Sequence, residues 1–437
     1  MSQFNTLPAS AVLRPTPFEL KIPNDAVDEL KLLLKHSKVP PDTYENTQED
    51  RRYGVTTKWI REAKARWENN FDWRAHEAHI NSFPHYISPI VDDDGTTYNI
   101  HFVALFSQKP DAIPIVLLHG WPGSFLEFLP ILDKLRTSYT PATLPYHLVV
   151  PSLPGYTFSS PPPVDKDLGL EDVARLFDKL ARGLGFENGY VVQGGDIGSI
   201  VARIMAATYP SCKAIHINFC IIPEPAGIDS SSLNDLDKQG LARTAEFSRL
   251  GSAYALTQAT KPGTIGIVLS SNPLALLAWI GEKFLAWNDE DPPLDTILES
   301  VTLYWFTDTI SRAFYPYRQL FTPGNAGAHS NPIWYINKPF GFSWFPKELG
   351  LVPRSWAATT GNLVFFRRHS KGGHFAALEC PEVLLKDLEE FVAQVWNAVT
   401  LDCAWVSASP VADVNNLGAR HLSFLINCAP LRRPQDK

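Results

Sequence analysis

The chain has 437 residues, of which 45% are hydrophobic and 19% are charged, so it can bury a large core as one elaborated domain or as two. Its net charge of -7, without a long basic run, argues against nucleic acid or an anionic membrane surface as the main partner. The five cysteines show no CxxC spacing, which predicts reduced, packed thiols rather than a disulfide framework or a zinc cage. No signal peptide and no run of roughly 18 apolar residues is present, so we expect a soluble, cytoplasmic protein without a membrane anchor.

The first hundred residues predict helices followed by a strand. After a proline-punctuated opening, residues 24–37 and 56–73 place apolar side chains at helical spacing. Residues 96–108 then alternate between apolar and polar side chains, which predicts a half-buried strand at the edge of a sheet.

An alternation of strands and helices follows. Three short, almost wholly apolar runs are separated by segments with helical patterning, at residues 114–120, 146–156 and 189–196. This order is typical of a parallel sheet wound with helices. Residues 199–210 predict the next helix and residues 213–220 the next strand.

The alternation stops between residues 221 and 328, where helical patterning rich in Pro, Asn and Trp predicts an inserted lid. Residues 331–339 and 361–369 then predict the last strands, and residues 381–396 an amphipathic closing helix. The expected divisions are an N-terminal helical and extended segment (1–100), the first part of an α/β core (101–220), a helical lid (221–328), the second part of the core (329–400) and a C-terminal tail of unknown role (401–437).

Asp196 lies where the strand at 189–196 turns into the following helix. Gly194 and Gly198 flank it two positions on either side, which is the small-residue frame of a strained turn that exposes one side chain. In the α/β-hydrolase architecture that side chain is the nucleophile, and the N–H of the next residue, here Ile197, faces the developing oxyanion. A carboxylate there would attack carbon and leave an ester for water to cleave. A simple turn or cap residue is the structural alternative.

Cleavage of such an ester needs a general base, usually a histidine oriented by a carboxylate. His374 follows the strand at 361–369 in a Gly-Gly loop, whereas His369 lies beside two arginines, where a positive neighbourhood would weaken its basicity. We therefore favour His374 as the base. The acid follows by exclusion, because Glu348 is the only carboxylate from Thr309 through Leu378.

The stretch HGWPGSFLEF (119–128) follows a buried strand and adds a second loop of the same kind. The backbone N–H of Trp121 can complete an oxyanion hole with that of Ile197. An ordinary strand-to-helix turn with Trp121 as a packing residue is the alternative, and both can hold, because a backbone donor leaves the indole free to pack.

Taken together, HGWPGSFLEF, VVQGGDIGS, SAYALTQATKPGTIG, FSWFPKELG and GGHFAALECPE resemble the microsomal-type epoxide hydrolases of the α/β-hydrolase superfamily, from about residue 15 to residue 398. The resemblance implies an α/β-hydrolase fold with a mostly parallel central sheet, an inserted helical lid and an N-terminal segment that wraps the core. It also implies the roles of nucleophile, base and acid for Asp196, His374 and Glu348. Two lid tyrosines would hold the epoxide oxygen: Tyr254 matches one, and Tyr317 matches the other better than Tyr315 does.

The expected function is conversion of an apolar or aryl epoxide and water to a vicinal diol through a hydroxyalkyl-aspartyl ester, without a metal or organic cofactor. A haloalkane dehalogenase would typically place a Trp directly after the nucleophile, where this chain has Ile197. A serine esterase is disfavoured because the residue between Gly194 and Gly198 at the strained turn is Asp196, and Ser199 lies three positions later. A non-catalytic receptor that keeps the lidded pocket is a further alternative. The oligomeric state, a homodimer included, stays open.

Overall fold

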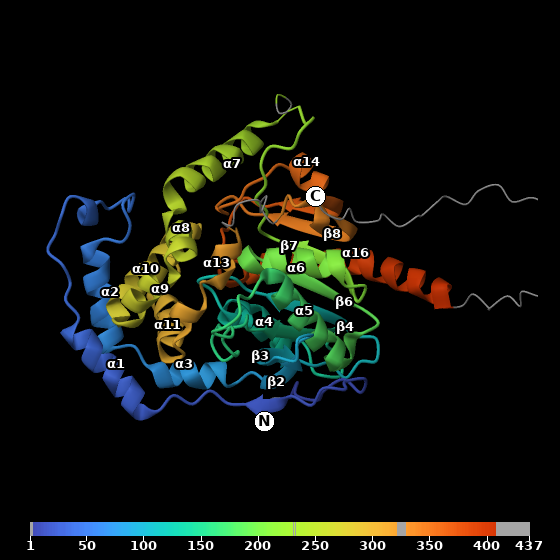
Figure 1. Cartoon of the computed structure of the whole chain (residues 1–437), viewed down its shortest axis with the longest axis horizontal. Helices are drawn as coiled ribbons and strands as arrows, with labels where there is room; N and C mark the ends of the chain where they lie inside the picture. The colour runs from blue at the N-terminus through green and yellow to red at the C-terminus, as the bar shows by residue number, and fades with distance from the viewer. Residues whose placement is uncertain (1–2, 230, 232, 321–328, 408–437) are drawn as a thin grey trace, which may run out of the picture.

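The computed structural model describes residues 3–229, 231, 233–320 and 329–407. Within these residues the central sheet has nine strands in the order β1-β2-β3-β5-β4-β6-β7-β8-β9 (Figure 1). The pairings from β5 through β4 to β9 are parallel, and β1, β2 and β3 join antiparallel. The strands are β1 (Thr16–Phe18), β2 (His85–Val91), β3 (Thr97–Leu105), β4 (Ile113–Leu118), β5 (Tyr146–Pro151), β6 (Tyr190–Gly194), β7 (Cys212–Ile217), β8 (Ile336–Trp344) and β9 (Gly361–Arg368). The predicted mostly parallel sheet is confirmed.

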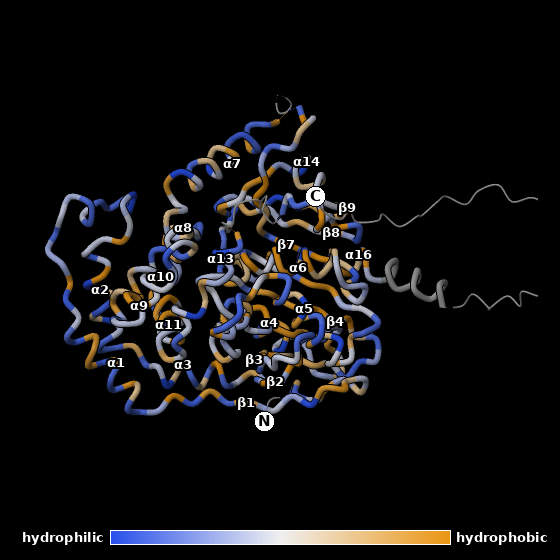
Figure 2. The backbone as a smooth tube through the Cα atoms, viewed as in Figure 1, coloured by the Kyte–Doolittle hydropathy of each residue, from blue (hydrophilic) through white to orange (hydrophobic). Residues whose placement is uncertain are grey.

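Four helices pack around the parallel strands: α4 (Leu129–Ser138), α5 (Leu170–Ala181), α6 (Asp196–Thr208) and α16 (Pro381–Ser407). Both α6 and α16 pack on β7 and β8, while α5 packs on α6 and α4 on α16. Figure 2 shows hydrophobic residues concentrated along the central strands, and all six residues of β5 are buried. A strand that is covered on both faces needs such a continuous apolar run.

Two sequence-based expectations about strands are wrong. The strand predicted for residues 96–108 is not at the sheet edge, because β1 and β2 pair beyond β3 and cover it. The strand predicted for residues 331–339 begins five residues later, at Ile336, after a short 3-10 turn, and continues to Trp344. The C-terminal end of β8 was missed because Gly341 and Ser343 interrupt its apolar pattern, although its last five residues are all buried.

In the described residues between β7 and β8 (218–229, 231, 233–320 and 329–335), the chain forms helices and turns and adds no strand to the sheet. The α-helices are α7 (Asp235–Glu246), α8 (Ala253–Thr260), α9 (Pro262–Ser270), α10 (Pro273–Trp287), α11 (Leu294–Phe306), α12 (Thr309–Arg312) and α13 (Tyr315–Leu320). We call this set of helices the lid. The domain limits expected from the sequence stay a prediction.

The N-terminal helices lie against the lid as well as beside the sheet (Figure 1). They are α1 (Asn24–His36), α2 (Thr57–Asn69) and α3 (Trp73–Ile80); α1 and α2 contact α10, and α3 contacts α11. The buried indole N–H of Trp67 donates to Thr302 Oγ1 at 2.9 Å. The N-terminal segment therefore connects the outer sheet strands to the lid, as expected of a wrapping segment.

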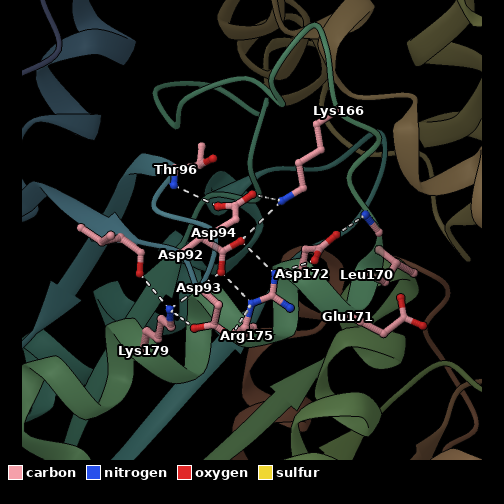
Figure 3. A network of polar contacts seen from close by, with 12 residues as sticks. Asp92, Asp93, Asp94, Thr96, Lys166, Leu170, Glu171, Asp172, Arg175 and Lys179 are labelled. Atoms are coloured by element: carbon pink, nitrogen blue, oxygen red, sulfur yellow. Dashed lines mark hydrogen bonds and ion pairs between the residues drawn. The ribbon is translucent and has the colours of Figure 1, made fainter.

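A network of charged groups fixes the added strands to the core (Figure 3). Asp92, at the turn from β2 to β3, has a fully buried side chain and accepts two hydrogen bonds from the Arg175 guanidinium of α5, at 2.6 and 2.8 Å. Arg175 also pairs with Asp172 at 2.6 Å, and Lys166 pairs with Asp94 at 2.6 Å. Burial of the Asp92 side chain distinguishes the Asp92–Arg175 pair from exposed ion pairs such as Arg51–Asp291.

Among the described residues, no single helix has the length and apolar composition to cross a membrane; α9 and α10 together meet that test, but they are bent by 116° at their junction. Cys212, Cys220 and Cys380 are free thiols, as predicted. Cys428 and most of the predicted tail at 401–437 lie outside the described residues, whereas α16 continues to Ser407.

Candidate active site

Asp196 occupies a sharp turn between β6 and α6, as the sequence predicts. Its φ is 45°, a left-handed conformation that costs energy for a residue with a side chain. Gly194 and Gly198 are required by close backbone approach: a Cβ on Gly194 would lie 2.3 Å from the carbonyl oxygen of Gly198, and one on Gly198 would lie 2.2 Å from that of Leu118. The two glycines therefore allow the turn that presents the Asp196 carboxylate at the end of the sheet.

The structure brings His374 and Glu348 to this carboxylate. His374 Nε2 lies 3.3 Å from Asp196 Oδ2, and His374 Nδ1 donates to Glu348 Oε1 at 2.6 Å. The same Glu348 oxygen accepts the N–H of Leu349 at 2.6 Å. Both His374 and Glu348 have side chains that are 1% exposed, so the hydrogen bond between them is shielded from water and fixes the orientation of the imidazole.

The charge on His374 is set by these two carboxylates. Burial disfavours the imidazolium, but the charges and hydrogen bonds of Glu348 and Asp196 outweigh burial and raise the pKa of His374 to about 10. Before reaction, the ring is therefore an imidazolium paired with two carboxylates.

The lid holds the loop that carries His374. The backbone N–H of His374 donates to the carbonyl oxygen of Trp287 at 2.8 Å, where α10 ends. A Cβ on Gly373 would lie 2.4 Å from that same oxygen, so the glycine permits the contact. The Trp287 ring also packs edge-on against the His374 ring, with centroids 5.1 Å apart.

A backbone N–H group contacts the Asp196 carboxylate from the loop after β4, and a second backbone N–H, that of Ile197, lies at the start of the helix beside it. The N–H of Trp121 donates to Asp196 Oδ1 at 2.9 Å. Ile197 lies in the first turn of α6, where N–H groups have no partner within the helix and the helix dipole is positive. Gly120 makes room for this approach, since a Cβ there would lie 2.2 Å from Asp196 Oδ1.

Both candidate lid tyrosines lie around the Trp121 ring. Tyr254 stacks on it at 5.1 Å and 14°, and Tyr317 meets it edge-on at 5.8 Å. Burial, together with the negative charge of Asp196, raises the pKa of each tyrosine, so both phenols keep their protons at neutral pH. Tyr315 is also buried, but its neighbours are Tyr98, Arg318 and Asp172, not Asp196, so the geometry favours Tyr317 over Tyr315.

Asp196 and His374 line a cavity of about 10 Å³, a volume that holds about one water molecule. Two further polar residues line it, Glu127 and Asn218, and the sequence reasoning missed both. Glu127 lies within HGWPGSFLEF (119–128), and its place between Phe125 and Phe128 was a sign that its carboxyl is not fully exposed. Asn218, just after β7, carried no comparable signal.

His369, which the sequence disfavours as the base, lies in a different environment. His369 Nε2 hydrogen-bonds Asp387 at 2.6 Å, and its ring stacks on Phe345. Ser199 hydrogen-bonds the backbone oxygen of Asp196 and the His329 ring, at 2.6 and 2.9 Å, behind the elbow. Within the described ranges, no group of three His, Cys, Asp or Glu side chains could hold a metal ion.

An α/β fold with a glycine-flanked aspartate at the turn from β6 to α6 is typical of the α/β hydrolases. Family models agree: residues 15–128 match the epoxide hydrolase N terminus and residues 113–228 match the alpha/beta hydrolase fold. A putative epoxide hydrolase from Dothistroma septosporum is 44% identical over 423 residues, covering 96% of this chain and 99% of its own. Epoxide hydrolase 1 from Oryctolagus cuniculus is 30% identical, covering 87% of this chain and 89% of its own.

Solved structures give the same result. The Aspergillus niger epoxide hydrolase is 53% identical, with a TM-score of 0.86 over 90% of this chain and 100% of that one. The juvenile hormone epoxide hydrolase from Bombyx mori is 27% identical, with a TM-score of 0.79 over 87% of this chain and 95% of that one. The chain belongs to the epoxide hydrolase family, and the fold expected from its sequence is confirmed.

Proposed function

We propose that the protein converts an apolar epoxide, aryl epoxides included, and water to a vicinal diol through a covalent ester on Asp196. The observation that carries this proposal is the hydrogen-bonded chain from Glu348 through His374 to Asp196, at 2.6 and 3.3 Å. Each member has the position that a two-step hydrolysis requires.

In the first step, Asp196 Oδ attacks an epoxide carbon and the carbon–oxygen bond of the ring breaks. The ring oxygen takes a proton from Tyr254 or Tyr317, which leaves a hydroxyalkyl ester and a phenolate. A strained ring needs this assistance because its leaving group is otherwise an alkoxide. The left-handed turn presents Asp196 to the substrate, and the Trp121 N–H holds the carboxylate in place.

Esterification changes the charge on His374. The ester carries no negative charge, so one of the two carboxylates that raise the pKa of His374 is lost. The proton on Nε2 then becomes easier to release and returns to the tyrosine phenolate left by the first step, so that the neutral imidazole can act as a base. Formation of the intermediate thus prepares His374 for the second step, while Glu348 keeps the other nitrogen protonated.

In the second step, His374 Nε2 takes a proton from water as the water oxygen attacks the Asp196 carbonyl carbon. The N–H groups of Trp121 and Ile197 stabilise the oxyanion. When the ester bond breaks, the alcohol takes the proton from His374, and the proton left on the Asp196 carboxyl passes to His374 Nε2, 3.3 Å away, which restores the imidazolium. The sum is epoxide plus water to diol, with the enzyme unchanged.

The rings near the reacting groups support an apolar substrate. Trp287, Phe219 and Phe375 each contact the His374 ring edge-on, with centroids 5.1 to 5.6 Å apart. Not every aromatic ring of the lid lies near the reacting groups. Phe306 of α11 packs on Trp73 of α3 and belongs to the contact between the lid and the N-terminal segment. Aromatic walls favour substrates that gain from leaving water.

A single turnover in H₂¹⁸O, with enzyme in excess over styrene oxide, tests the two-step route. In an ester mechanism, the label enters the Asp196 carboxyl and the first diol contains none, because water attacks the carbonyl carbon. Peptide mass spectrometry and analysis of the diol locate the label. Label in the first diol would mean that water attacks the epoxide directly, and the proposal would be wrong.

A further inference from the structure

Glu127 is a half-buried residue in the lining of the cavity beside Asp196 and His374, and the two-step reaction leaves it without a role. It belongs to the 3-10 turn Phe125–Phe128, which begins at Ser124 directly after the loop of Trp121. Its side chain lines the same small cavity as Asp196 and His374. An acidic side chain in such a place is costly unless it is neutral or interacts with a partner.

The loop is shaped to accept this carboxyl. A Cβ on Gly123 would lie 1.2 Å from Glu127 Oε1, so any residue other than glycine would displace the side chain. Gly120, three residues earlier, clears the space of the Asp196 carboxylate in the same way. The two glycines of HGWPG therefore make room for two carboxyl groups on one side of the loop. The lid closes over it, because the Tyr304 hydroxyl donates to the carbonyl oxygen of Gly123 at 2.8 Å.

The groups that face Glu127 come from several elements. His374, in the loop after β9, favours its ionised form, as does the backbone N–H of Ser124, whereas Asp196 of α6 opposes ionisation. Tyr304 of α11 is a further titratable neighbour. Burial is the largest influence and raises the pKa of Glu127 to about 8. At neutral pH the carboxyl keeps its proton, so it can both donate and accept a hydrogen bond.

The cavity is the size of one water molecule and has polar groups on more than one side. A water placed there lies among His374, which would take its proton, Asp196, whose ester carbonyl it would attack, and Glu127. A water held by the base alone can rotate, whereas a second hydrogen bond would fix the direction of its lone pair.

We propose that Glu127 is the positioning residue for the hydrolytic water: its carboxyl holds that water in the cavity while His374 removes a proton. The inference rests on the proposed function, because it assigns a part in the hydrolysis of the ester. Glu127 keeps its own proton throughout. One water hydrogen passes to His374, and the water oxygen forms the new bond to the Asp196 carbonyl carbon. The role is limited to the second step, because the first step uses no water.

The test measures the two steps separately in Glu127→Ala, Glu127→Gln and the unaltered enzyme, by rapid mixing with styrene oxide and quenching for intact mass. In Glu127→Ala we expect ester formation within about twofold of the unaltered rate and ester hydrolysis slowed at least tenfold, so that the ester accumulates. Glu127→Gln, which keeps the shape and both kinds of hydrogen bond, should restore hydrolysis to within a few-fold. A merely structural role would slow both steps together.

Unchanged hydrolysis in Glu127→Ala, or equal slowing of both steps, would overturn the inference. His374→Gln is the control for the mechanism itself. If it accumulates the ester and Glu127→Ala does not, only the inference about Glu127 fails; if no ester forms in His374→Gln, the proposed function fails. Should Glu127→Ala not fold, Glu127→Asp replaces it, because the shorter side chain withdraws the carboxyl and should also slow hydrolysis alone.

Discussion

At the scale of single residues, the candidate site places one histidine ring against two carboxylates, at 3.3 and 2.6 Å. His374 carries a proton because Glu348 and Asp196 both face it, and it can give that proton up only when one of the carboxylates becomes neutral. Burial, together with the negative charge of Asp196, raises the pKa of Tyr254 and of Tyr317 and keeps both phenols protonated. Acid and base are thus assigned by neighbours and by burial rather than by residue type.

The tyrosines give a direct prediction. Tyr254→Phe and Tyr317→Phe should each slow ester formation about 10- to 100-fold, because each removes one proton donor from the leaving oxygen. The rate of ester hydrolysis should change little. Tyr315→Phe is the matched control, since Tyr315 is equally buried but has other neighbours. Stopped-flow measurement of ester formation checks this, and an equal loss in Tyr315→Phe would contradict the assignment.

A second residue-scale prediction concerns pH. Ester hydrolysis needs neutral His374, so its rate should fall as the pH drops through the pKa that His374 has in the intermediate. Glu348→Gln removes a charge that raises this pKa. The acid limb of the rate profile should therefore move to lower pH, by at least about one unit for a lost buried charge, while the maximal rate falls. A limb at the same pH in single-turnover measurements would show that another group titrates.

At the scale of elements, much of the architecture can be predicted from the sequence, and the failures have physical causes. The apolar runs of β4, β5 and β6 are readable because parallel strands are covered on both faces. β2 escapes prediction because it contains Pro89 and a buried histidine, His85, and its pairing with β1 joins distant parts of the chain.

The residues of the candidate site also differ in how far local sequence predicts their positions. Asp196 can be predicted because glycines mark its turn, and Glu348 because the sequence around it has no other carboxylate. Glu127 carried a weaker signal, its place between Phe125 and Phe128, and only the folded chain shows that it lines the cavity beside Asp196 and His374. Tertiary contacts decide that, and they have no local pattern.

The attachment of β2 and β3 to α5 should contribute strongly to stability. Asp92→Ala leaves Arg175 without its bidentate partner in a largely buried place. We expect a loss of about 1.5–3 kcal/mol in the free energy of unfolding, because Arg175 loses two charge-assisted hydrogen bonds to a buried carboxylate while its pair with Asp172 remains. Asp291→Ala is the control: it breaks the exposed pair with Arg51 and should change stability little. Urea titration distinguishes them, and equal small effects would contradict the importance of the network.

At the scale of the whole molecule, several histidines are buried where the cost of burying a charge outweighs any nearby carboxylate. Burial lowers the pKa of His85, His119, His147 and His216 to about 4 each. In the unfolded chain these histidines have a pKa of about 6.5, so as the pH falls they bind protons there before they do in the folded protein. The folded state therefore loses stability between about pH 6.5 and pH 4.

The melting temperature should therefore fall steeply over that range. Each histidine contributes up to about 1.4 kcal/mol per pH unit. His374 has the opposite sign: its pKa is raised, so its contribution is complete below about pH 6.5 and is lost as the pH rises toward 10. Scanning calorimetry at fixed ionic strength measures both limbs. A melting temperature that stays constant from pH 6.5 to 4.5 would mean that these rings are not buried in neutral form.

The covalent ester on Asp196 is the central claim, and intact-protein mass spectrometry of His374→Gln tests it most directly. The variant is exposed to styrene oxide and, separately, to a bromoalkane. We predict that styrene oxide adds its whole mass to the peptide that contains Asp196, because the ester forms and cannot be hydrolysed. A folded protein that gains no mass from the epoxide, or that is alkylated only by the bromoalkane, would contradict the account.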